Sequence, residues 1–176
     1  MKLLISFLLT LSFCSAQPGI EWQKTIGGSN SDGLVKSILA QDGYLLSGTS
    51  FSNISGDKTV NGFSNQPHNW IVKINLNSEI LWQKAFGGSI GELNNNLVST
   101  NDNGFLISNT SSSNISGNKT ENSRGESDYW LVKIDEIGNI EWQKTIGGSG
   151  SEFDMMGIPC TDGGYFVGGS SRSTIS

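Results

Sequence analysis

A near-literal internal repeat is the feature that most constrains how this chain can fold. The repeated string reads IEWQKTIGGS from Ile20, ILWQKAFGGS from Ile80 and IEWQKTIGGS from Ile140, so equivalent residues stand 60 positions apart. Self-similarity at a fixed period means that one supersecondary unit is built several times. The chain therefore consists of repeated units that pack on one another.

Further repeated strings follow in the same order within each unit. NWIVKIN begins at Asn69 and YWLVKID at Tyr129; DGYLLSGTS, NGFLISNTS and GGYFVGGSS begin at Asp42, Asn103 and Gly163; NISGDKT and NISGNKT begin at Asn53 and Asn114. These strings divide the chain into repeat 1 at 20–79, repeat 2 at 80–139 and a partial repeat 3 at 140–176. We treat 17–176 as one repeat segment.

Each unit reads as four short strands. In the middle copy the expected strands cover 93–100, 105–110, 129–135 and 140–146. They are rich in aromatic and branched residues, and turn sequences such as Asp102-Asn103-Gly104 separate them. No segment shows a helical period. A unit of four antiparallel strands and about 60 residues is typical of a propeller blade. We predict an all-β, propeller-like fold with two full blades, a partial third and an incomplete ring.

Strand alternation predicts which side chains share a sheet face. Trp130, Val132 and Ile134 should lie on one face, with Leu131 and Lys133 on the other. In the next strand, Ile140 and Trp142 should share a face.

The fourth-strand sequence at 20–26 precedes any first strand, and we expect it to lack a partner because the third copy reaches Ser176 before its own Trp-Val-Lys strand. We expect unpaired edges and apolar faces at both ends of the segment, and self-association as their consequence.

The first 16 residues read as a signal peptide. A basic Met1-Lys2 is followed by an apolar run too short to span a bilayer, and Cys14-Ser15-Ala16 places small residues before a cleavage site at Gln17. We therefore expect a secreted or cell-surface protein. The alternative is a lipoprotein acylated at Cys14. No other apolar stretch approaches membrane length, so no membrane span is expected.

Charge and residue counts exclude several function classes. Without Lys2 the mature chain has 10 basic and 16 acidic residues, and this acidic balance does not suit a nucleic-acid binder. One histidine and one remaining cysteine are too few for the usual zinc or thiol-enzyme sites. We expect no cofactor and no catalytic residue.

The repeat strings resemble the secreted repeat proteins of Bacteroidetes, whose units run DGGY, a Gly/Ser-rich loop, DYWxVKID and GNIEWQKTxGGS. The matching stretches are 162–165, 128–135 and 138–149. The resemblance implies a β-propeller, often followed by a C-terminal sorting domain for type IX secretion. Residues 17–176 contain no such domain, so we expect either a piece of a longer protein or an export route that ends differently. The first copy departs from the pattern where Pro67-His68-Asn69 replaces Ser127-Asp128-Tyr129.

Acidic residues recur just after each Gly-Gly-Ser turn, at Asp32, Glu92 and Glu152. Carboxylates and turn carbonyls suit calcium, so these three are the candidate metal ligands. The alternative is that each carboxylate accepts hydrogen bonds from turn N–H groups. We expect this second role, because a position kept in every repeat usually serves the repeat.

The remaining candidates have structural explanations beside functional ones. We expect His68 to be a solvated loop residue and Cys160 a small half-buried residue of the third copy's first strand. The lysines near the tryptophans, such as Lys73 and Lys133, should pack their stems on rings while their ammonium groups reach water. The tryptophans could stack on sugars, but their strand positions favour packing.

The long loops at 51–69 and 111–128 vary most between copies, and binding residues often lie on loops. We expect a non-catalytic scaffold or interaction module that binds an unknown protein or glycan through these loops. The alternatives are part of a quinoprotein-like propeller enzyme, which the Gly-x-x-x-Trp strand ending suggests, and a carbohydrate-binding adhesin.

Overall fold

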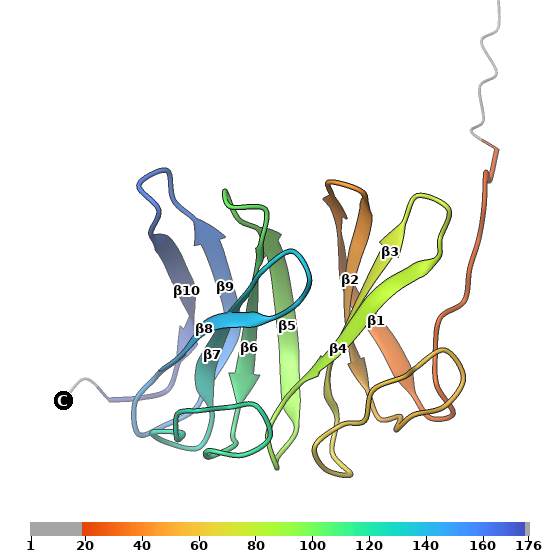
Figure 1. Ribbon diagram of the computed structural model, residues 1–176. Coiled ribbons are helices and arrows are strands. Elements are labelled where there is room, and N and C mark those ends of the chain that lie inside the picture. Colours follow the sequence, from red (N-terminus) through yellow and green to blue (C-terminus); the bar gives the residue numbers. More distant parts are fainter. Residues whose placement is uncertain (1–18, 175–176) are drawn as a thin grey trace, which may run out of the picture.

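The structure is a computed structural model that describes residues 19–174 and, within them, all side chains except those of Asn94 and Asn95. The described chain folds into antiparallel β-sheets that stand side by side (Figure 1). Two of these sheets have four strands and the third has two. This confirms the predicted all-β class and the four-stranded antiparallel unit. The predicted signal peptide at 1–16 lies outside the described residues.

Strand order follows the chain within every sheet. The first sheet contains β1 (Asp32–Ala40), β2 (Gly43–Ser50), β3 (His68–Asn75) and β4 (Ile80–Phe86). The second contains β5 (Glu92–Ser99), β6 (Phe105–Ser111), β7 (Asp128–Ile134) and β8 (Ile140–Ile146). The third pairs β9 (Glu152–Pro159) with β10 (Tyr165–Ser171). In the middle copy the observed strand ends fall within one residue of the predicted ones.

Turn chemistry explains these strand boundaries. Asn103 adopts a left-handed φ of 64°, and the Thr100 N–H donates to the Gly104 carbonyl to close the β5–β6 hairpin. The turn between β7 and β8 uses Gly138 at φ 82°. No helix capable of crossing a membrane occurs among residues 19–174.

Apolar side chains between neighbouring sheets form the core. We call the face of each sheet that is turned toward the preceding sheet in the chain its trailing face, and the opposite face its leading face. The trailing face of the first sheet and the leading face of the third therefore have no described sheet against them. Leu45 and Ile71 of the first sheet's leading face pack with Trp130, Val132 and Ile134 of the second sheet's trailing face. Leu106, Tyr129 and Leu131 of the second sheet's leading face pack in turn against Met155, Tyr165 and Val167. The second sheet is thus covered on both faces, and the predicted division of β7 between two faces is confirmed.

A β-bulge changes the predicted faces of the fourth strand. Lys133 pairs with Trp142 but Ile134 pairs with Ile140, so one extra residue interrupts the register. Ile140 therefore packs on the trailing side and Trp142 on the leading side. The prediction that these two residues share a face was wrong, because a bulge shifts the alternation of side chains by one residue.

Residues 20–26 do not form the strand that their sequence predicts. They carry no strand pairing, although β4 and β8 have closely similar sequences. A strand requires a neighbour to receive its backbone hydrogen bonds, and within residues 19–174 no strand pairs with this segment. In Figure 1 the segment runs along the outside of the first sheet.

Candidate functional site

The three recurring carboxylates occupy the same position in each sheet, at the start of its first strand. Asp32 accepts hydrogen bonds from the Gly28 N–H at 2.7 Å and from the Ser50 and Ser52 hydroxyls at 2.5 and 3.1 Å. Glu92 accepts from Gly88, Ser111 and Ser113 at 2.9, 3.2 and 2.9 Å. Glu152 accepts from Gly148, Ser171 and Ser173 at 3.4, 2.7 and 2.5 Å. Each carboxylate therefore faces N–H and O–H donors, which fits the capping role better than a cation site.

The three caps differ in protonation behaviour. Burial pushes the pKa of Asp32 and Glu152 upward, but their hydroxyl and N–H donors outweigh it and each pKa lies below its ordinary value. Burial prevails at Glu92 and raises its pKa despite the same kinds of donor. Glu92 belongs to the second sheet, which alone has a described sheet on both sides. Each copy places a carboxylate here, but the direction of its pKa shift depends on its place in the stack.

A loop lysine lies close to each of the first two caps. Lys58 and Lys119 are 1% and 2% exposed, and each follows an NISG turn. Lys58 contacts the His68 ring, with 2.6 Å between its Nζ and Nε2, and donates to Ser50. Burial lowers the pKa of Lys58 to about 8. Neither lysine was a sequence candidate, although the repeated NISG-x-Lys-Thr string and the Ser-x-Ser pairs signalled this network.

His68 is buried, contrary to the prediction of a solvated loop residue. It begins β3, is 3% exposed, and occupies the position that Asp128 holds in β7. Burial and the charge of Lys58 lower the pKa of its imidazole. The prediction was wrong because a strand begins at His68 and the Lys58 loop covers its ring.

At the opposite ends of the strands, lysines hold the hairpin turns. Lys133 lies 2.7 Å from Glu141 and 2.9 Å from Asp102, whose pKa falls to about 2 through hydrogen bonds from Thr100 and Lys133. Lys73 lies 2.6 Å from Asp42. Both lysine side chains are buried, so the expectation that their ammonium groups reach water was wrong. They end on carboxylates instead.

The tryptophans serve packing within and between sheets. Trp70 and Trp130 are buried, and each indole N–H donates over 3.0 Å to a glutamine of the next strand, Gln83 or Gln143. Trp142 packs edge-on to Tyr165, with 5.3 Å between ring centroids. Cys160 is half-buried as expected, but it lies in the turn after β9 rather than in the strand.

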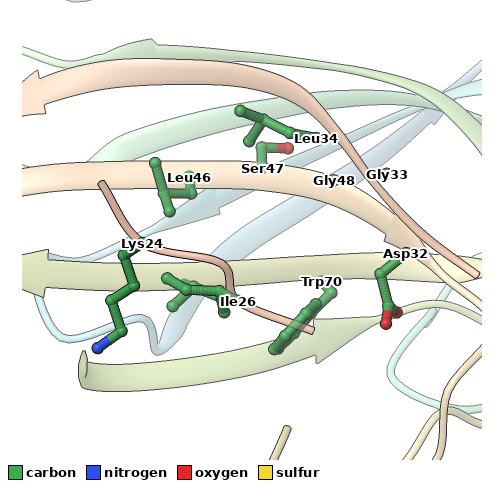
Figure 2. Close-up of a pocket in the computed structure, with 10 residues that line it drawn as sticks. Lys24, Ile26, Asp32, Gly33, Leu34, Leu46, Ser47, Gly48 and Trp70 are labelled. Atoms are coloured by element: carbon green, nitrogen blue, oxygen red, sulfur yellow. The ribbon is translucent and has the colours of Figure 1, made fainter. Parts of the chain in front are cut away.

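The trailing face of the first sheet carries the groove shown in Figure 2. This hollow of about 210 Å³ is lined by Trp70, Val72 and Leu46, and Ile26 lies beside Trp70. Lys24 stands at one end and Asp32 at the other. The corresponding face of the second sheet is covered by the first sheet, so the groove marks an uncovered surface.

The two long loops lie at the same edge of the sheets, opposite the hairpin turns (Figure 1). The first loop holds a hollow of about 350 Å³ lined by Asn53, Asn61 and Phe63 among others. The Phe63 ring lies against Gly117 of the second loop. A methyl group added at Gly117 would come within 2.8 Å of that ring. The loops thus form one continuous surface.

Searches of protein-family models, curated proteins and solved structures find no match to this chain. Within residues 19–174, no group of three or more His, Cys, Asp or Glu residues is arranged to hold a metal ion.

Proposed function

We propose that this protein is an exported propeller-type scaffold without catalytic activity, which binds a protein or glycan partner through its long loops. The sheets would be blades of a propeller, with the first and third sheets at the two ends of the described stack. The repeat strings and the stacking of successive four-stranded sheets support this architecture.

One observation carries the binding role. The charged and aromatic residues that recur between copies hold the sheets together through caps, ion pairs and indole bonds. After their shared NISG-x-Lys-Thr strings the two loops differ between copies; they share one edge and present partly exposed side chains such as Phe63, which is 40% exposed. A rigid scaffold with variable loops at one edge is the usual arrangement of a binding module.

A site-specific photocrosslinker tests this proposal. We expect a crosslinker at Phe63 to capture a defined extracellular protein or glycan, whereas one at Leu76, exposed in a turn at the opposite edge, captures nothing above background. Excess unlabelled protein should compete with capture, and replacing 61–65 by glycine and serine should abolish the competition. Equal capture at both positions would contradict a loop-mediated function.

A further inference from the structure

Residues 20–26 contact the first sheet in the way that β4 and β8 contact the sheets after them. The Trp22 ring lies 6.4 Å from the ring of Tyr44, just as Trp142 lies against Tyr165 two sheets later. Ile26 packs on the trailing-face residues Trp70 and Val72. The equivalent Phe86 packs on Trp130 and Val132. The segment therefore occupies the place of a fourth strand that precedes the first sheet.

The sheet to which this strand would belong is absent from the described chain. Gln83 accepts the indole N–H of Trp70, and its amide donates to the Asp57 carbonyl, which ties β4 to its own sheet. Gln143 does the same with Trp130 and Asn118. Gln23 occupies the equivalent position but is exposed, and within residues 19–174 it makes neither bond.

At the other end of the stack, the third sheet has one face that no described sheet covers. The trailing face of the β9–β10 sheet packs on the second sheet, but its leading face exposes Ile158 and Phe166, at 45% and 64%. Their register equivalents in the second sheet, Val98 and Leu106, pack between sheets. Pairing of β10 is described on one side only, with β9.

The two open faces are the two halves of an interface that the chain already forms twice. A leading face meets a trailing face between the first and second sheets, and again between the second and third. We propose that the groove on the first sheet's trailing face binds the β9–β10 sheet of a second copy, head to tail, beside residues 20–26. This inference rests on the propeller-type stacking proposed above. Because the two surfaces differ, the contact is heterologous and can propagate or close into a ring.

Variants at the two faces test the proposal in the full chain. Leu34 lines the groove and is 67% exposed, so Leu34→Glu blocks only the trailing face, and Phe166→Glu blocks only the leading face. We expect the unchanged chain to associate at about 100 µM in sedimentation velocity, and each variant to associate roughly tenfold or more weakly. Leu76→Glu, at an exposed turn residue, is the matched control and should associate like the unchanged chain.

Mixing the two variants gives the decisive result. Leu34→Glu keeps an intact leading face and Phe166→Glu an intact trailing face, so the mixture should form a heterodimer and nothing larger. Unchanged melting temperatures of the single variants show that they fold. A monomeric unchanged chain, a mixture that stays monomeric, or an equal effect of Leu76→Glu would each overturn the proposal. Loop crosslinking at Phe63 is independent of these variants, so the proposed function and this interface fail separately.

Discussion

At the residue scale, one chemical group is reused with different results. The carboxylate that begins each sheet accepts from one glycine N–H and two serine hydroxyls in all three copies. The second sheet has neighbours on both sides, and there burial raises the pKa of Glu92, whereas the donors prevail at Asp32 and Glu152. The environment of a repeated carboxylate therefore sets the direction in which its pKa shifts.

The capping role of these carboxylates can be measured. Asp32→Ala and Glu152→Ala should each lower the free energy of unfolding by about 0.5–2 kcal/mol, because turn N–H and hydroxyl donors lose their acceptor. Calcium should leave the melting temperature unchanged. Glu136→Ala, at an exposed turn residue, is the control and should have little effect. A calcium-dependent rise in melting temperature that the substitutions abolish would show that the metal interpretation is right.

Burial of His68 predicts a loss of stability in acid. Its pKa lies below the ordinary value of 6.5, so below that pH the unfolded chain binds more protons than the folded one. Stability should fall as pH drops through 6.5, with a contribution of up to about 1.4 kcal/mol per pH unit. His68→Gln keeps an acceptor for Lys58 and should remove this part of the slope. Urea unfolding of both proteins between pH 5 and 7.5 measures it, and identical slopes would exclude His68 as the cause.

At the scale of strands and turns, the bulge in each fourth strand directs the tryptophan toward the next sheet. Lys73 pairs with Trp82 and Lys133 with Trp142 just before the register shifts. The Trp82 indole N–H then donates to the Glu136 carbonyl of the second sheet over 3.2 Å. The bulge thus turns the tryptophan side chain of one sheet toward the next sheet, where its indole N–H donates a hydrogen bond.

Two turn glycines separate backbone strain from this contact. Gly138 and Gly163 have φ values of 82° and 86°. A methyl group added at Gly138 would lie 2.9 Å from the Trp82 ring, whereas a methyl group added at Gly163 would have no neighbouring atom within 4 Å. Gly163→Ala should cost about 1–2 kcal/mol from backbone strain alone. Gly138→Ala should lower the free energy of unfolding by about 1–3 kcal/mol more than Gly163→Ala does, because the Trp82 ring must move. Equal losses in denaturant unfolding would mean that the Trp82 contact contributes nothing.

At the scale of the whole molecule, the second sheet is the best protected part of the described chain. Both β6 and β7 are buried along their full lengths, and each has a paired strand on either side. The first and third sheets each present one open face, which carries exposed apolar residues such as Leu34 and Phe166.

Hydrogen exchange should follow this order. Amides of β6 and β7 should exchange most slowly, because they open only with global unfolding. Amides of residues 20–26 should exchange fastest in the monomer, because they have no strand partner. Mass spectrometry of peptic fragments from dilute protein measures this directly. A 20–26 segment as protected as β8 would contradict the open-ended stack and favour a self-contained β domain.

Sequence patterns alone were enough to predict the four strands of the middle copy, their order and their ends. Turn residues such as Asn103 and Gly138 and the spacing of 60 or 61 residues between copies are local or periodic signals, so the middle-copy strands could be located to within one residue. The capping carboxylates could also be found, because recurrence marked them.

Which side chains are buried and which sheet faces stay open became clear only from the folded chain. His68 and Lys58 are polar and lie in or beside a loop in sequence, yet they bury each other because β3 begins at His68. A one-residue bulge reversed the expected faces of Ile140 and Trp142. Residues 20–26 have the sequence of a strand but lack the neighbour that would make them one. Burial and pairing depend on residues distant in the chain, and strand propensity alone supplies no partner.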